Sequence, residues 1–383
     1  MLKTVSLLLP LYVTVFWVIL LNRQKDTHST PRSFLAKLMF LFLILNISRF
    51  FQLEPLPECF VYVDILYLYA GTLGFPLYHI YFRLLTVDQK FTWNVHYRFL
   101  ILPLILSTIY LIAVFLTPYN EYKLWLFDRA AFLNLPQIRV LKILRIIILL
   151  SIEIQAIYYL ILNTLVLKKY SDRAEQFYSN MVDGKYNNAK TLNLLVIFNC
   201  LIHVVAAIDL AHPTTTKLVI YSVLYAIDYY MMGYMGYRQK AINPTFEVEL
   251  DSPAEKDFGT ALNAEQRKIL NKMLTEFELN KIHLNSELTI LDITQIIGTN
   301  RTYLSSMINQ EYNQNFCAFV NGYRMRELER IIHEDDDHAA NELLAEKAGF
   351  GSVISMKRAI SAKTGLSIPE WKKQILVSEL TPI

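Results

Sequence analysis

The sequence predicts an all-α protein: a seven-helix transmembrane bundle followed by a cytoplasmic all-helical domain with two helix-turn-helix units. Three observations predict this fold. Long apolar runs fill residues 1–240 and are absent from the rest of the chain. The net charge changes sign at the same boundary. Helical spacing of apolar residues resumes at residue 263 and is interrupted by two glycine-centred turns.

The composition is typical of a membrane protein with a soluble appendage. Of the 383 residues, 54% are hydrophobic and 19% are charged, whereas soluble chains carry about 25% charged residues. The content of 24 Tyr and 22 Phe excludes a disordered or acidic-tail protein. Three scattered cysteines, Cys59, Cys200 and Cys317, are too few for a disulfide scaffold or a zinc cluster, so no metal or other cofactor is expected.

The formal net charge of +3 is the sum of two opposed parts. Residues 1–240 carry a net charge of +9 and residues 241–383 a net charge of −6. Residues 241–262 are rich in acids, contain two prolines and have no helical period, which is typical of a linker. The predicted organisation is therefore a membrane sensor region at 1–240, a linker at 241–262 and a helical domain at 263–383.

Seven segments are long and apolar enough to be predicted as membrane spans, since a spanning helix needs about 20 mainly apolar residues. The second requires Lys37 and Arg49 to reach the interface from its ends. The first has no basic leader or small-residue cleavage site, so we interpret it as retained rather than as a signal peptide. The spans are Thr4–Asn22, Phe34–Phe51, Glu58–Phe82, Phe99–Asn120, Ile143–Leu167, Thr191–Leu210 and Lys217–Tyr237.

The distribution of Lys and Arg predicts the orientation of these spans. With the C-terminus in the cytoplasm, the cytoplasmic loops and span ends hold 14 of these residues and the outer ones hold 8. The bias favours an external N-terminus and a cytoplasmic C-terminal domain.

Ionisable residues inside the predicted spans are candidates for a ligand site, because charges in the bilayer are costly. Asp64 and Glu153 lie within the third and fifth spans. Asp228 in the seventh shares a helical face with Tyr221 and Tyr225, which suggests a tyrosine-lined acidic pocket for a small cationic or polar ligand. The alternative is that these acids pair with Arg or Tyr side chains and fix helix packing.

The first helix-turn-helix unit follows a helix predicted over Ala264–Ile282. Thr289 and Asp292 form a capping box at the start of a short helix, and Gly298 ends that helix at a position suited to positive φ. Asn300 is a natural N-cap for a second helix. This second helix is expected to expose four residues able to reach phosphates or base edges: Arg301, Thr302, Ser305 and Ser306.

A similar unit recurs near the C-terminus. A helix over Asn341–Ala348 is followed by the turn Gly349-Phe350-Gly351 and by a helix capped by Ser352 that runs to about Lys363. Lys357 and Arg358 are expected to point outward from that helix. A longer helix over Phe316–Ile332 is predicted to fix the spacing of the two units.

Residues from about 263 to 378 resemble the DNA-binding domain of AraC/XylS-type bacterial transcription regulators. The resemblance is carried by LTILDI and GTNRTYLS in the first unit, by FVNGYRMRELERII in the connecting helix, and by AEKAGFGSVISMKRAISAKTGLSIPEW in the second unit. The whole chain is similar to membrane-anchored members of that family, in which a multi-helix membrane region replaces a soluble sensor domain.

The resemblance implies a membrane-tethered, sequence-specific transcription regulator in the cytoplasmic membrane of a bacterium. It implies that the second helix of each unit enters the major groove of double-stranded DNA and that the protein acts as a homodimer. It also implies that a small molecule or a membrane signal controls binding. The DNA-contact candidates that it places in the second unit are Ser352, Ser355, Lys357 and Arg358, with Val353, Ile354 and Arg358 at base-facing positions.

Two hypotheses stay open. Residues 261–383 hold 14 basic and 16 acidic residues, so one domain alone is expected to bind DNA weakly and to require pairing. In the alternative, the seven-span region is a receptor whose helical tail binds a protein partner. An enzyme is not expected, because metalloprotease, hydrolase and nucleotide-binding motifs are absent.

Overall fold

The structure is a computed structural model that describes residues 2–23, 30–54, 57–86, 91–127, 135–180, 185–209, 214–238, 262–334 and 340–378. Over these residues the chain is helical, apart from turns and one isolated β-bridge between Tyr178 and Thr289. The chain divides into two compact units, the first made of Met1–Leu167 and Asn188–Ile242 and the second of Lys168–Asn187 and Asn243–Ile383.

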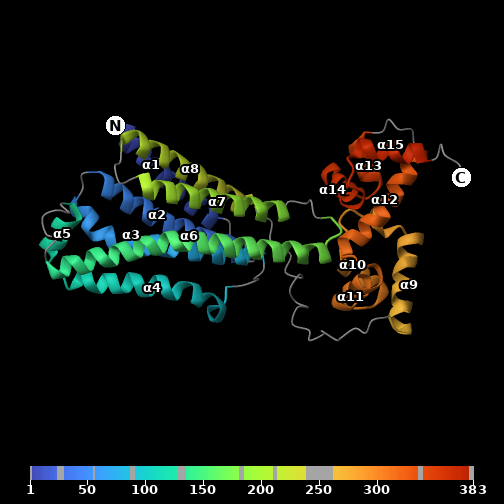
Figure 1. The fold of residues 1–383 in the computed structure, drawn as a ribbon, viewed down its shortest axis with the longest axis horizontal. Helices are drawn as coiled ribbons and strands as arrows, with labels where there is room; N and C mark the ends of the chain where they lie inside the picture. The colour runs from blue at the N-terminus through green and yellow to red at the C-terminus, as the bar shows by residue number, and fades with distance from the viewer. Residues whose placement is uncertain are drawn as a thin grey trace. The chain divides into compact units, whose positions relative to one another are not determined.

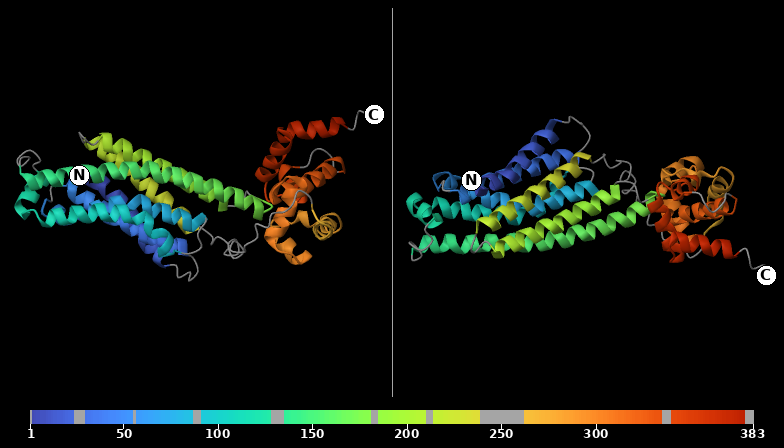
Figure 2. Two further views of the ribbon diagram at one scale, coloured as in Figure 1. Left: turned by 60° about the horizontal axis from the view of Figure 1, so that its bottom comes forward. Right: turned by 90° about the horizontal axis from the view of Figure 1, so that it is seen from above.

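The first unit is a bundle of helices that lie alongside one another (Figures 1 and 2). Each predicted span overlaps one long helix, and a short helix between the fourth and fifth predicted spans, α5, was not predicted. The helices are α1 (Leu2–Arg23), α2 (Thr30–Leu53), α3 (Pro57–Thr86), α4 (Trp93–Phe115), α5 (Tyr119–Phe127), α6 (Pro136–Phe177), α7 (Lys185–Asp209) and α8 (Thr215–Arg238).

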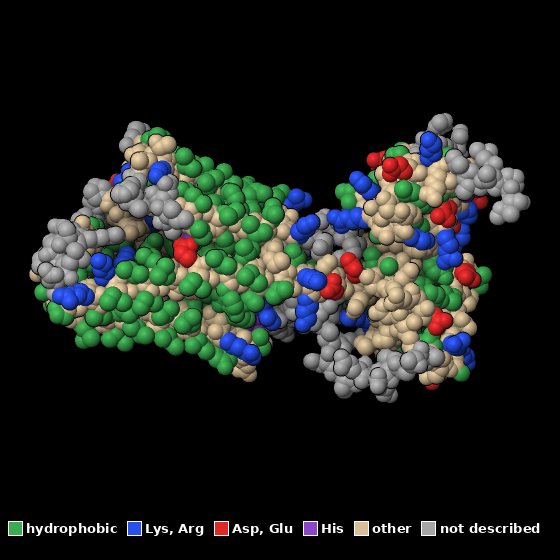
Figure 3. Space-filling view, in the orientation of Figure 1, with side chains coloured by type: hydrophobic (Ala, Val, Ile, Leu, Met, Phe, Trp, Pro, Cys, Tyr) green, Lys and Arg blue, Asp and Glu red, His purple; other side chains and the backbone are tan. Residues whose placement is uncertain are grey.

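Four helices of the first unit, α1 to α4, are long and apolar enough to cross a membrane. Hydrophobic side chains cover most of the visible face of this unit in Figure 3, and few charged side chains interrupt them. Ile101, Ile112 and Phe115 on α4, for example, are 43%, 54% and 79% exposed. A soluble protein rarely exposes so continuous an apolar surface, whereas a lipid environment would cover it.

Close packing inside the bundle depends on a small residue. Helix α1 packs against α2 and α8, and α2 packs against α3. At Gly233 on α8, an added Cβ would collide with the indole ring of Trp17 on α1, which is itself 2% exposed. A glycine at this position therefore lets α1 and α8 approach closely.

The second unit holds the helices that were expected after residue 263, together with two that were not predicted. In chain order they are α9 (Ala264–Leu279), the 3₁₀ helix η2 (Ile282–Leu284), α10 (Ile290–Ile297), α11 (Arg301–Tyr312), α12 (Phe316–Glu334), α13 (Asn341–Lys347), α14 (Val353–Thr364) and α15 (Ile368–Ser378). The two that were not predicted are η2 and α15. Helix α12 joins two hydrophobic cores. Its first half packs into the core around α9 to α11, and its second half packs into the core around α13 to α15.

The predicted caps of these helices are confirmed. Thr289 and Asp292 form the capping box of α10, and Gly298 ends that helix with a φ of 75°. The side chain of Asn300 accepts from the Tyr303 amide at 2.8 Å, which starts α11. Ser352 accepts from the Ser355 amide at 3.2 Å, which starts α14. The predicted linker, residues 241–262, lies outside the described residues except for Leu262, which is buried.

One part of the second unit comes from a region that the sequence assigned to the membrane part. Lys168–Asn187 groups with the C-terminal helices, although the prediction placed it within 1–240. Phe177, the last residue of α6, is 1% exposed and belongs to the core formed by α9 to α12.

Candidate functional site

The helix pair α10–α11 presents three of its four predicted contact residues at a partly open surface. Thr302, Ser305 and Ser306 are half-buried on α11, while Leu304 and Met307 between them are buried in the core. The hydroxyl groups therefore lie on the side of α11 that the core leaves accessible.

Arg301 differs from expectation, because it is only 8% exposed. Its guanidinium carbon lies 5.6 Å from the centroid of the Phe177 ring, a cation–π distance. Helical spacing alone placed Arg301 on the outer face of α11. In the structure the end of α6 covers it.

The segment that follows α6 is tied to the second unit by backbone contacts. The Ser179 amide donates to the Leu288 carbonyl at 3.2 Å, beside the bridge between Tyr178 and Thr289. The Asn180 side chain donates to the Ser286 carbonyl at 2.5 Å. These contacts hold the segment against the start of α10 in the manner of a short added strand.

Arg324 on α12 is the residue that organises this contact, and the sequence did not single it out. It is wholly buried, and its guanidinium donates to the carbonyl oxygens of Ser179, His283 and Asn285 and to the Ser179 hydroxyl, at 2.8 to 3.0 Å. Burial lowers its pKa to about 10. A buried guanidinium is tolerated because these carbonyls and the hydroxyl accept its hydrogen bonds.

A pattern in the sequence marks the position of Arg324. It lies between Val320 and Leu328 at four-residue spacing, so it interrupts an otherwise apolar stripe of α12. A charged residue on a core-facing stripe indicates a buried partner, but it does not say which one.

The helix pair α13–α14 presents the remaining predicted contact residues. Lys357 and Arg358 are exposed on α14. Ser352 is half-buried, and Ser355 is 6% exposed, and both serve as the reciprocal cap of α14. Ile354 is 56% exposed. Lys357 and Arg358 are therefore better placed than the two serines to contact an external anion.

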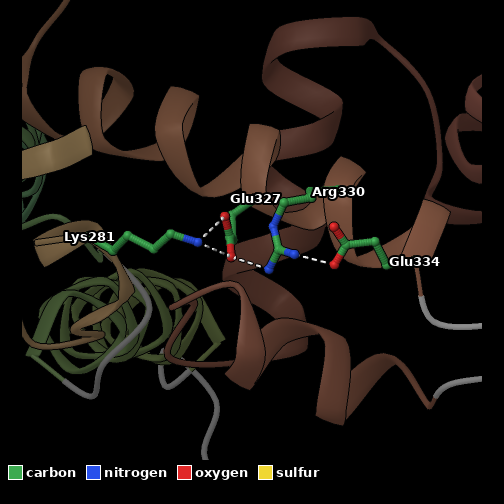
Figure 4. Close-up of polar contacts among 4 residues, drawn as sticks. All are labelled: Lys281, Glu327, Arg330 and Glu334. Atoms are coloured by element: carbon green, nitrogen blue, oxygen red, sulfur yellow. Dashed lines mark hydrogen bonds and ion pairs between the residues drawn. The ribbon is translucent and has the colours of Figure 1, made fainter. Parts of the chain in front are cut away.

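Two other basic residues of the second unit are paired with acids. Lys281 and Arg330 both contact Glu327, at 3.2 and 2.7 Å, and Arg330 also pairs with Glu334 (Figure 4). The hydrogen bond from Arg330 is the main cause that lowers the pKa of Glu327. These cations are less available to neutralise phosphates than Lys357 and Arg358.

Within the bundle, Asp64 is fully enclosed by partners. Arg145 donates to both of its carboxylate oxygens at 2.8 Å, and Tyr110 and Tyr122 donate to Oδ2 at 3.2 and 2.6 Å. Asp64 is 0% exposed and joins α3, α4, α5 and α6. Of the two interpretations of this acid, the geometry favours helix packing over ligand contact.

The other four candidates in the bundle lie apart from Asp64. Glu153 and Tyr225 line one cavity. Asp228 is 0% exposed and accepts from Asn199, which lines the same cavity, at 2.7 Å. Tyr221 is 7% exposed and is not part of the cavity wall. The shared helical face of Tyr221, Tyr225 and Asp228 is therefore mainly a packing face.

No protein-family model matches this chain, and no curated protein matches it either. Among the described residues, no group of three or more His, Cys, Asp or Glu side chains could hold a metal ion.

Proposed function

We propose that this protein is a membrane-tethered, sequence-specific DNA-binding transcription regulator that couples a membrane or external signal to gene expression. The observation that carries the proposal is the repetition of two short helix pairs, α10–α11 and α13–α14, separated by α12. Each second helix begins with a side-chain cap, and α14 exposes Lys357 and Arg358. Helix pairs joined by a tight turn can lay the second helix in the major groove.

The tether is proposed to have seven spans, with the N-terminus outside a bacterial inner membrane and the second unit in the cytoplasm. Exposed apolar side chains on the three helices beyond α1 to α4 support the larger number of spans. They include Ile146, Leu150, Ile154, Ile157 and Ile161 on α6, Leu194, Leu201 and Val205 on α7, and Ile220, Val223 and Ile227 on α8. A bilayer would cover this surface, while Arg145 and Glu153 on α6 face other helices.

Coupling is proposed to run along α6, because this one helix takes part in both units. Its bundle part lines the cavity through Leu149, Ile152 and Glu153. Its last turn supplies Phe177, which covers Arg301 on α11. A signal that shifts α6 would change the accessibility of a predicted phosphate contact, and Arg324 would hold Ser179 in place in the covered state.

The alternative is a seven-span receptor whose helical tail binds a protein. The 56% exposure of Ile354 favours it, because an apolar side chain at a base-facing position suits a protein interface as well as a thymine methyl.

Selection of bound fragments from random DNA by the full-length protein in lipid nanodiscs tests the proposal. We expect enrichment of a discrete sequence, tighter when two chains share a disc. Lys357→Ala with Arg358→Ala should abolish enrichment. The control double variant, Lys268→Ala with Lys373→Ala, removes the same amount of charge from exposed positions on α9 and α15. The control should retain the enrichment. Two results would contradict specific DNA recognition by α14: no enriched sequence with the wild-type protein, or an equal loss of enrichment in both double variants.

A further inference from the structure

A cavity of about 100 Å³ lies inside the bundle between α2, α3, α6, α7 and α8. This volume exceeds the roughly 10–15 Å³ that a cavity needs to hold one water molecule. Its wall is mainly aromatic and aliphatic and includes Tyr67, Phe75, Tyr78, Tyr225 and Tyr229. Small-molecule sites commonly combine such an apolar wall with a few polar groups that fix the orientation of the ligand.

The first polar group of the cavity is the carboxylate of Glu153. His203 Nε2 lies 3.2 Å from Glu153 Oε1, and His203 Nδ1 lies 3.5 Å from the Tyr225 hydroxyl. With a proton on Nε2, the neutral ring donates to Glu153 and accepts from Tyr225. Glu153 Oε2 is buried and has no hydrogen-bond partner among the described residues. An unsatisfied buried carboxylate oxygen is costly, and a ligand that carries an N–H donor would satisfy it.

The second polar group is the guanidinium of Arg49. Its carbon lies 5.3 Å from the centroid of the Tyr225 ring, and no carboxylate pairs with it among the described residues. A guanidinium in an apolar wall is stabilised by a carboxylate or phosphate, whose oxygens accept two parallel hydrogen bonds from its N–H groups. Arg49 therefore offers a site for an anionic group in a cavity that Glu153 also lines.

Asp228 is excluded as a ligand contact, because it is not part of the cavity wall. Its Oδ2 accepts from the Asn199 amide at 2.7 Å, and its Oδ1 is buried without a hydrogen-bond partner among the described residues. Asp64 is excluded as well, because Arg145 and two tyrosines satisfy it elsewhere in the bundle.

We infer that the cavity binds a small zwitterion with a compact apolar body, its anionic group on Arg49 and its amine on Glu153. The inference deepens the proposed function by naming the class of signal, and it rests on that function only for its biological meaning. In the proposed orientation, Arg49 lies one turn from the outer end of α2, so the ligand would enter from the external side. The headgroup of a zwitterionic lipid offers the same pair of charges.

Binding to the full-length protein in nanodiscs of anionic lipid tests the inference, with alanine, valine, leucine and phenylalanine as probes. Each amino acid is compared with two analogues: the amine that lacks its carboxylate and the acid that lacks its amino group. We expect at least one amino acid to bind more tightly, by about tenfold or more, than either of its two analogues. Repeating the titration in discs that contain phosphatidylethanolamine distinguishes the two sources, because a headgroup in the cavity would suppress amino-acid binding.

Charge-neutral variants locate the two contacts. Arg49→Met should weaken binding of the amino acid and of the acid but not of the amine. Glu153→Gln should weaken binding of the amino acid and of the amine but not of the acid. Arg23→Met and Glu58→Gln remove one charge of each sign outside the cavity and should leave binding unchanged.

Three results would overturn the inference: no saturable binding by any amino acid, equal binding of an amino acid and its amine, or full binding by both cavity variants. The titrations contain no DNA. A failure here therefore leaves the proposed regulatory function standing, and a failure of DNA selection leaves the binding site standing.

Discussion

The guanidinium of Arg301 lies over the ring of Phe177, with 5.6 Å between its carbon and the ring centroid. This contact joins the first residue of α11 to the last residue of α6. Both residues belong to the second unit, although the sequence prediction placed Phe177 in the N-terminal region 1–240. Under the proposed regulatory function, a shift of α6 that moves Phe177 would change the accessibility of Arg301 to DNA.

Replacing Phe177 by Leu should uncover Arg301 without emptying the core. Leucine retains much of the apolar volume but gives no cation–π contact, so the cost in stability should be about 1–2 kcal/mol. If Arg301 reaches a phosphate when free, DNA affinity should rise and the slope of log K against log salt should steepen by about 0.9. DNA titrations of the full-length chain at several salt concentrations measure both quantities.

Phe277→Leu is the matched control for that change. Phe277 is fully buried in the same core, where its ring stacks on His283 and also contacts Phe319 and Tyr323 rather than Arg301. Its replacement should lower stability to a similar degree and leave the salt slope unchanged. An unaltered slope in Phe177→Leu would show that Arg301 does not contact phosphate.

Arg324→Met should destabilise the second unit by about 3 kcal/mol or more. The substitution leaves carbonyl oxygens of Ser179, His283 and Asn285 without a buried donor. Arg326→Met on the same helix removes an exposed guanidinium that lies 4.0 Å from the Tyr323 ring centroid and should cost less than about 1 kcal/mol. Urea unfolding scored by pulse proteolysis of the full chain measures both, and equal effects would argue against Arg324 as the organising residue.

Asp64 and Arg145 should show strong energetic coupling. Asp64→Asn or Arg145→Met alone leaves a buried group without its charged partner and should cost about 3 kcal/mol. The double variant should lose less than the sum of the two, because neither charge is then stranded. Thermal unfolding of the wild type, the single variants and the double variant in detergent measures this double-mutant cycle. The exposed pair of Glu58 and Lys123 serves as a comparison and should show little coupling. Additive losses at Asp64 and Arg145 would contradict a direct pair.

Acid should weaken the second unit through His283. Burial lowers its pKa to about 4, below its ordinary value of 6.5, so the folded unit binds the proton less readily than the unfolded chain. The contribution of neutral His283 is fully present above pH 6.5. It is lost as the pH falls toward about 4, at up to about 1.4 kcal/mol per pH unit.

The urea midpoint of the second unit at about pH 7.5 and about pH 5 checks this expectation. His283→Phe retains a ring to stack on Phe277, 6.1 Å away in the wild type, and removes the titrating group. The variant should lose less stability on acidification than the wild type. An equal loss in both proteins would assign the acid sensitivity to other groups.

The sequence predicted the helices well where the determinants are local. Apolar run length predicted the helices of the bundle, and short-range caps at Thr289, Asn300 and Ser352 predicted where three helices of the second unit begin. The short helix α5 was missed, because its nine residues give no apolar run of spanning length. Lys357 and Arg358 lie on the exposed side of α14, as their helical spacing predicted.

The placement of Arg301, Phe177, Ser179 and Arg324 was decided by tertiary structure alone. Arg324 and Ser179 are 145 positions apart, and the contact depends on how the residues that follow α6 fold against the C-terminal helices of the same unit. Hydrophobic periodicity shows which face of a helix is buried, but it does not identify the surface that covers that face. By itself the sequence determined a helical membrane-type region followed by capped helix pairs, because spans and caps are encoded within a few turns of chain. Only the tertiary structure decided that Arg145 and two tyrosines enclose Asp64, that one buried oxygen of Glu153 has no hydrogen-bond partner among the described residues, and that Phe177 covers Arg301. Each of these depends on side chains that other helices contribute.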